Sequence, residues 1–109
     1  MHPVISNMFK NIPAQLPEEL TECLHKRETV KLERIISRGH STPAGQWYDQ
    51  DQDEWVMLLQ GQAILLYEIG PQRIHLIAGD YLLIPAHTRH RVDWTQSDFD
   101  TIWLAAHLH

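Results

Sequence analysis

Residues 79–94 read GDYLLIPAHTRHRVDW, an apolar run with a turn on each side. Gly79 and Asp80 favour a tight turn, and Pro85 ends the run because proline cannot donate a hydrogen bond within a sheet. A further short run begins at His90. Because side chains alternate between the two faces of a strand, this frame also determines the face on which His90 lies. The stretch predicts two short strands joined by a turn, with His90 facing inward at the start of the second.

The chain around this stretch continues the same pattern from Val30 onward. Residues 30–37 alternate between two sets of side chains and are rich in β-branched residues. Short apolar or alternating runs, separated by turn signals, follow at positions 55–59, 63–68, 73–77, 81–84, 90–94 and 101–106. About seven short strands without a long helical period are typical of an antiparallel sandwich or barrel. We therefore expect an all-β fold with its ligand site in the mouth and interior of a barrel.

The N-terminal part of the chain has a different pattern. Three prolines in the first 17 residues predict an extended arm over the surface. Pro17 followed by two glutamates is typical of a helix start, and Leu20 and Leu24 lie at helical spacing, so we expect a short helix over residues 18–26. The single domain, residues 1–109, then consists of an arm with a short helix, 1–29, and a β-barrel, 30–106.

Composition and charge narrow the classes of function. The 109 residues are 43% apolar and carry a formal charge of −5, which argues against nucleic-acid binding because such proteins need basic faces. No stretch approaches the roughly 18 apolar residues of a membrane helix, and the N-terminus lacks the apolar core of a signal peptide. The single cysteine, Cys23, agrees with a reducing compartment. We expect a cytoplasmic protein with no nucleic-acid or membrane partner.

The opening stretch resembles the second signature motif of the cupin superfamily. The family pattern places a glycine, a proline and a metal-binding histidine at the spacing of Gly79, Pro85 and His90. His87 and Trp94 stand where the pattern has a second glycine and an asparagine. The resemblance implies a small single-domain cupin of bacterial type, with a jelly-roll or double-stranded β-helix barrel. It also implies a homodimer, because cupins frequently pair through edge strands, and the N-terminal arm is the candidate for crossing between subunits.

A second segment resembles half of the first cupin motif, so that the resemblance covers residues 30–106. Glu54 and Gly61 have the required spacing, with WVMLLQ between them, but the preceding pair of histidines is absent. Depending on the number of intervening residues, the positions of that pair fall on Trp47 and Asp49 or on Tyr48 and Gln50. This half of the motif supports the fold more strongly than it supports a metal site.

The resemblance implies a mononuclear metal site in the barrel, for Zn, Fe, Mn or Ni. Cupins typically supply three histidines and one glutamate, and the surviving equivalents are Glu54 and His90. Carboxylate oxygen binds divalent cations well, so Asp49 is a candidate replacement for one histidine. His87 lies three residues before His90 and is a candidate fourth ligand. Each has a plainer interpretation: Glu54 at a strand start, Asp49 capping a loop, and His87 in a turn.

Aromatic and basic residues indicate a second kind of site, for an organic ligand. Trp47 occupies a ligand position and lies with Tyr48 in a polar loop, where both are candidates for a pocket mouth. Arg91 is a candidate for holding an anionic group, and Trp94 for aromatic contact. His107, on the last strand, is a candidate for the same pocket. Arg91 on a solvated edge and His107 at an exposed terminus are the alternatives. Two tryptophans within apolar strands are expected to fill the core, Trp55 and Trp103.

Three classes of function remain open from the sequence. The first is a metal-dependent small-molecule enzyme, such as a dioxygenase or isomerase, with Glu54 and His90 holding the ion. The second is a non-catalytic barrel that binds or senses a small ligand and has lost the metal. The third is a structural dimer whose barrel is filled by side chains. The sequence contains no Ser/His/Asp or Cys/His nucleophile arrangement, phosphate-binding glycine loop or HExxH motif that supports another catalytic class.

Overall fold

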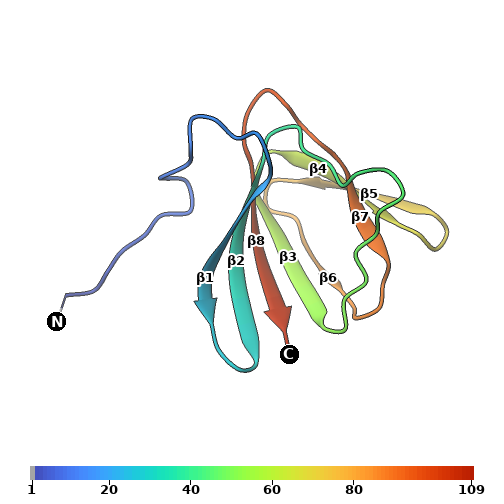
Figure 1. The fold of residues 1–109 in the computed structure, drawn as a ribbon, viewed down its shortest axis with the longest axis horizontal. Helices are drawn as coiled ribbons and strands as arrows, with labels where there is room; N and C mark the ends of the chain where they lie inside the picture. Colours follow the sequence, from blue (N-terminus) through green and yellow to red (C-terminus); the bar gives the residue numbers. More distant parts are fainter. Residues whose placement is uncertain (1) are drawn as a thin grey trace.

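The computed structural model describes residues 2–109, which form two antiparallel sheets in a jelly-roll barrel (Figure 1). The strands are β1 (Leu20–Lys26), β2 (Val30–Ser37), β3 (Asp53–Gln60), β4 (Gln62–Tyr67), β5 (Gln72–Ile77), β6 (Tyr81–Ile84), β7 (His90–Thr95) and β8 (Thr101–Leu108). The larger sheet has the order β1-β2-β8-β3-β6, and the smaller sheet has the order β5-β4-β7. The all-β prediction is confirmed. Among the described residues there is no helix long and apolar enough to cross a membrane.

The seven strands that the sequence predicts all form, with bounds within two residues of those expected. Between β3 and β4 the chain passes from the larger to the smaller sheet at Gly61, whose φ is +90°. A Cβ atom at this position would lie 2.7 Å from the Cα of Thr101, closer than real Cβ atoms approach. Glycine is therefore required both by the left-handed backbone and by the close approach of β8.

The expected short helix over residues 18–26 is wrong, because this segment contains strand β1 instead. Leu20 and Leu24 are four residues apart, a spacing that fits both the helical and the strand period. A helix this short is marginal on its own, whereas the edge of β2 offers a row of unpaired backbone groups. β1 satisfies these groups by pairing antiparallel with β2. As a result Glu19 and Thr21 face the interior of the barrel.

The N-terminal arm is held against the outer face of the larger sheet by two arginines. Arg34 is 5% exposed, and its guanidinium donates to three carbonyl oxygens of the arm, those of Met8, Lys10 and Asn11. Arg38 donates to two more, those of Pro13 and Ala14. Residues 8–14 are thereby fixed, whereas residues 2–6 extend away from the barrel, with Val4 and Ile5 exposed to solvent (Figure 1).

The hydrophobic core lies between the two sheets. It is built from buried apolar side chains of both sheets: Val56, Leu58, Ala63, Leu65, Leu76, Ile84, Trp103 and Ala105. Four of these also line an internal cavity, namely Val56, Leu65, Ile84 and Trp103. The packed core therefore forms one wall of the cavity, and the polar residues described next form the other.

Candidate functional site

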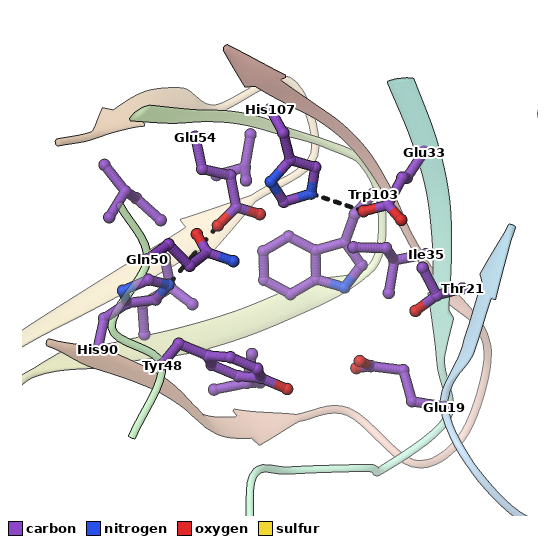
Figure 2. Close-up of a pocket in the computed structure, with 14 residues that line it drawn as sticks. Glu19, Thr21, Glu33, Ile35, Tyr48, Gln50, Glu54, His90, Trp103 and His107 are labelled. Carbon is purple, nitrogen blue, oxygen red and sulfur yellow. Dashed lines mark hydrogen bonds and ion pairs between the residues drawn. The ribbon is translucent and has the colours of Figure 1, made fainter. Parts of the chain in front are cut away.

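The cavity between the two sheets has a volume of about 150 Å³ and is lined by charged and apolar side chains (Figure 2). Its titratable residues come from four strands and two loops: Glu19, Glu33, Tyr48, Glu54, His90 and His107. The site is thus assembled from segments far apart in the sequence. Open volume beside His90 counts against a barrel that is merely filled by side chains.

Glu54 on β3 and His90 on β7 face each other from the two sheets. They are 8% and 5% exposed, and His90 Nε2 lies 3.7 Å from Glu54 Oε1. His90 Nδ1 lies 2.7 Å from the carbonyl oxygen of Thr88, which can only accept a hydrogen bond. Nδ1 therefore carries a hydrogen, and Nε2 is the nitrogen turned toward the carboxylate. This contact fixes the imidazole in the orientation that an acid–base pair or a metal ligand requires.

Opposing effects set the charge of His90. Burial lowers the pKa of His90 because it disfavours the imidazolium. The carboxylate of Glu54 and the carbonyl of Thr88 raise the pKa and together outweigh burial, so that it lies above its usual value. The ring of Tyr67 packs edge-on at 6.4 Å from the imidazole, and burial followed by the charge of Glu54 raises the pKa of Tyr67. The surroundings of Glu54 therefore favour the protonated forms of both His90 and Tyr67.

A second histidine–carboxylate pair continues from the first. His107 on β8 lies opposite Glu54 in the strand register, and His107 Nε2 is 2.6 Å from Glu33 Oε1. The other oxygen of Glu33 lies 3.2 Å from the Nζ of Lys31. Figure 2 shows the ring of His107 between the carboxylates of Glu54 and Glu33. His90, Glu54, His107 and Glu33 thus form a row of alternating imidazoles and carboxylates along one wall.

Tyr48 lies at the mouth of the cavity. Its backbone is paired with that of His90 by hydrogen bonds of 2.8 and 3.1 Å, and the two rings are 5.7 Å apart. Burial raises the pKa of Tyr48, and the charges of Glu19 and Glu54 add to this rise against a hydrogen bond with Thr42. An outer hollow of about 340 Å³ is also lined by Glu19 and Tyr48. These two side chains therefore separate the inner cavity from the outer hollow.

Asp49 and His87, two of the predicted metal ligands, lie outside the cavity and contact each other. His87 Nδ1 is 3.4 Å from Asp49 Oδ1, and their side chains are 72% and 43% exposed. His87 has a φ of +60° at the position where the cupin pattern has a glycine, so the left-handed backbone is retained without that glycine. The structure does not bring these two residues to Glu54 and His90.

Three of the five predicted ligand-binding residues also lie outside the cavity lining. The guanidinium carbon of Arg91 lies 5.7 Å from the ring centre of Trp47, a cation–π contact. Arg91 also donates to Asp93 over 2.8 Å. Trp94 is 41% exposed on the surface. The structure places only Tyr48 and His107 of the five at the cavity.

The donor set of the barrel is smaller than the resemblance implies. In the part of the chain that the structure describes, residues 2–109, no three or more His, Cys, Asp or Glu side chains are grouped so as to hold a metal ion. The four predicted metal ligands form two separate pairs, one buried and one exposed. Glu54 and His90 fit a two-donor cation site and do not fit a closed site with four protein ligands.

Sequence reasoning missed three polar residues of the lining, Glu19, Thr21 and Glu33, and noted Gln50 only as a possible position of the absent histidine pair. The first two were hidden by the expected helix. Glu33 shares its strand parity with Ile35, which also lines the cavity, and this alternation is a signal that the sequence does contain. Trp103, expected in the core, is buried there and also forms part of the cavity wall.

Comparisons with known proteins agree with this geometry. A family model described as a cupin domain matches residues 35–107. The chain belongs to the cupin family. A crystal structure from Ralstonia eutropha, named "putative mannose-6-phosphate isomerase", is similar with a TM-score of 0.92 and 43% identity, covering 97% of this chain and 98% of that chain.

More distant cupins and cupin-like proteins share the fold. A cupin superfamily protein from Desulfitobacterium hafniense has a TM-score of 0.74 at 23% identity, covering 89% of this chain and 83% of that chain. The polyketide cyclase RemF from Streptomyces resistomycificus has a TM-score of 0.72 at 16% identity, covering 84% and 66%. No match was found among curated proteins. The cupin fold and the cavity together establish a small-molecule type of site in this barrel.

Proposed function

We propose that this cupin binds a small organic molecule in its barrel and moves a proton on it, with Glu54 and His90 as the acid–base pair. The observation that carries the proposal is their buried contact, with Nε2 and Oε1 3.7 Å apart beside an open cavity. General acid–base catalysis needs an acid and a base held side by side, with pKa values adjusted by burial and by each other. The Ralstonia protein carries the name of an isomerase, which supports the same class of chemistry.

Glu54 and His90 provide the base and the acid that an isomerisation through an enediol needs. The Glu54 carboxylate removes a proton from the carbon next to a substrate carbonyl, and the C–H electron pair forms a carbon–carbon double bond. The carbonyl oxygen takes up the electron pair of the C=O double bond and receives a proton from the His90 imidazolium. The protonated Glu54 then gives its proton to the former carbonyl carbon, and the neutral His90 takes the proton of the neighbouring hydroxyl as that oxygen becomes the new carbonyl, which restores both side chains. The reaction therefore needs no oxidant, reductant or second substrate.

Solvent deuterium exchange tests this proposal. The protein is incubated in D₂O with neutral aldoses, ketoses and their 6-phosphates, and NMR follows the loss of the proton next to the carbonyl. We expect exchange in at least one compound, slowed about 100-fold or more by Glu54→Gln and by His90→Asn. A thermal-shift screen of the same compounds reports binding. Binding without exchange in any compound would overturn the catalytic proposal in favour of a non-catalytic binding or sensing barrel.

A divalent cation at the same pair is a second candidate, favoured by the orientation of His90. A histidine that ligates through Nε2 commonly donates its Nδ1–H to a carbonyl, as His90 does to Thr88. Glu54 and His90 would hold Zn, Fe, Mn or Ni, and the cation would polarise a substrate oxygen as a Lewis acid. After equilibrium dialysis against each metal, His90→Ala should lose the bound ion and His87→Asn should keep it. Equal metal content in the wild type, His90→Ala and His87→Asn would contradict a metal site at Glu54 and His90.

We also propose that the protein is a homodimer, and its cytoplasmic location stays a prediction. Val4 and Ile5 are 93% and 91% exposed, and β1 forms an edge of the larger sheet. An apolar arm and an open edge are surfaces that a second copy can cover. Light scattering should give twice the chain mass of 12.7 kDa for the full chain and the single mass after removal of residues 2–7. A monomeric full chain contradicts this proposal.

A further inference from the structure

We infer that the ligand of the barrel is a small neutral polyhydroxy compound, and that the cavity rejects phosphate esters. This inference rests on the proposed small-molecule site, but it does not depend on the proton transfer. Three observations carry it: the charge of the lining, an indole N–H without a partner, and the volume of the cavity.

Three carboxylates line the cavity, and Lys31 and two histidines contact two of them. Glu19, Glu33 and Glu54 contribute to the lining, and among residues 2–109 no lysine or arginine does. Glu33 and Glu54 have histidine partners, whereas Glu19 accepts a hydrogen bond from the hydroxyl of Ser37 at 2.7 Å. A phosphate ester carries a charge of about −1.5 to −2 near neutral pH. In this partly desolvated site such an anion is repelled by the carboxylates, whose free oxygens need hydrogen-bond donors.

Trp103 contributes a hydrogen-bond donor to the cavity, and this donor needs an acceptor. Its side chain is 4% exposed and lines the cavity, and among the described residues its Nε1–H has no hydrogen-bond partner. In Figure 2 the indole nitrogen lies on the side of Thr21 and Glu19. The nitrogen is shielded from solvent, so a ligand reaches it after a side-chain rotation, and such rotations are common at binding sites. A buried donor without a partner is destabilising, and a ligand atom that accepts from it removes that cost.

A hydroxyl group meets both requirements at once. It donates one hydrogen bond, which a carboxylate accepts, and it has lone pairs that accept from the indole N–H. An ammonium group satisfies the carboxylates but cannot accept from Trp103. A phosphate dianion accepts from Trp103 but has no proton to donate to Glu19. A small molecule with several hydroxyl groups therefore satisfies the largest number of hydrogen-bonding groups in the cavity wall.

The volume agrees with a compact ligand. The cavity measures about 150 Å³, and an apolar cavity of about this size holds one benzene ring. An open chain of a few hydroxylated carbons, or part of a pyranose, therefore fits the enclosed part. A larger ligand has to extend past Glu19 and Tyr48 into the outer hollow.

The indole N–H signal of Trp103 tests the inference directly. Each tryptophan gives its own indole signal in ¹H–¹⁵N NMR spectra, and Trp103→Phe identifies that of Trp103. The probes are glycerol, erythritol, xylitol, D-glucose and D-mannose, each paired with its monophosphate. We expect at least one neutral compound to shift the Trp103 signal saturably, with an affinity about tenfold or more above that of its phosphate.

Two conservative variants sharpen the test. Trp103→Phe keeps an aromatic ring, although a smaller one, and removes the donor, and it should weaken binding of the neutral compound about three- to tenfold. Trp55→Phe is the control, because its ring packs against Tyr81 at 5.6 Å and is not part of the lining. Glu19→Gln removes one negative charge, so it should reduce the ratio of the affinity for the neutral compound to that for its phosphate at least threefold. Glu68→Gln, outside the cavity, should leave that ratio unchanged.

The outcomes separate this inference from the proposed function. A phosphate that binds as tightly as its neutral parent, or a Trp103 signal that no neutral compound moves, would overturn the inference. Glu54→Gln should lose deuterium exchange and still show the shift of the Trp103 signal. A shift without exchange in the wild-type protein contradicts proton transfer and leaves the ligand class supported.

Discussion

Two histidine–carboxylate pairs lie close together in the chain and differ in their surroundings. The inner pair, His90 and Glu54, is buried in the cavity, and the ring of His90 is fixed by the carbonyl of Thr88. The outer pair, His87 and Asp49, is largely exposed, with side chains 72% and 43% accessible to solvent. The atoms of the two pairs are 3.7 and 3.4 Å apart, so distance alone does not distinguish them.

The difference arises from backbone and burial, and not from residue type. His90 is the first residue of β7, where backbone hydrogen bonds with Tyr48 hold it in the barrel. His87 lies in the preceding turn with a φ of +60°. Charges in a partly dry cavity interact strongly, whereas charges in water are screened. Two histidines three positions apart, each beside a carboxylate, therefore form a chemical site in one case and a surface contact in the other.

The largest expected effect is on proton exchange at the inner pair. Glu54→Gln and His90→Asn should each slow solvent deuterium exchange into the bound substrate by about 10²- to 10⁴-fold, because each removes one partner of the acid–base pair. The matched outer variants, Asp49→Asn and His87→Asn, should change the rate less than about twofold. Asparagine is chosen at position 87 because it tolerates a positive φ. NMR under single-turnover conditions measures the rates, and equal loss at both pairs would abolish the distinction between them.

The next effect is on stability, at the inner contact of His107 and Glu33. His107→Leu removes the partner 2.6 Å from Glu33, which is 7% exposed and keeps only Lys31 beside it. We expect a loss of about 1 to 3 kcal/mol in the free energy of unfolding, because a largely buried carboxylate loses a hydrogen bond. Urea unfolding measures it. His87→Asn serves as the outer control, and a loss at His107 no larger than that of the control contradicts the prediction.

The fold could be predicted from the sequence because its signals are local. Alternating apolar residues, with glycine and proline at the turns, locate seven of the strands. β1 was missed because the spacing of Leu20 and Leu24 fits two periods. What decides between them is the open edge of β2, which is distant in the sequence and is not visible in any short window.

The predicted residues that line the cavity are determined by strand register, except Tyr48, which lies in a loop. Glu54 and His90 follow from the turns and strands that flank them, and both face the cavity. Asp49 and His87 belong to a loop and a left-handed turn, whose side-chain directions no periodic pattern encodes. Trp103 and Glu33 meet the cavity through the pairing and packing of β2 and β8, which is a tertiary property. The resemblance to the cupin motifs therefore located Glu54 and His90 at the cavity, but it did not locate the residues that surround them there.

A smaller effect is expected on the pKa of His90. Burial lowers this pKa, and Glu54 with the carbonyl of Thr88 raises it by more. Glu54→Gln removes the negative charge and should lower the pKa, whereas Asp49→Asn should leave it unchanged. Histidine NMR titration in the presence of a chelator measures both. An unchanged pKa in Glu54→Gln would show that the two side chains do not interact.

The raised pKa of His90 also predicts in which direction the stability of the protein changes with pH. A histidine whose pKa is raised on folding contributes stability below its unfolded value of about 6.5 and loses it as the pH rises through the folded value. The stability advantage of the wild type over Glu54→Gln should therefore be greatest below about pH 6.5 and fall as the pH rises. Urea unfolding at a series of pH values measures this, and an advantage that grows with pH has the wrong sign.

The smallest effect is expected at the outer pair itself. Asp49→Asn should change the free energy of unfolding by no more than about 0.5 kcal/mol, because an exposed ion pair gains little in water and loses part of that gain to side-chain ordering. Whatever difference remains should disappear in about 1 M salt, where the screening length is about 3 Å. The inner pair should keep most of its effect in the same salt, since both of its partners are buried. A salt-resistant cost of more than about 1 kcal/mol at Asp49 would mean that the outer contact is shielded from solvent, and burial would no longer explain why only one of the two pairs forms a site.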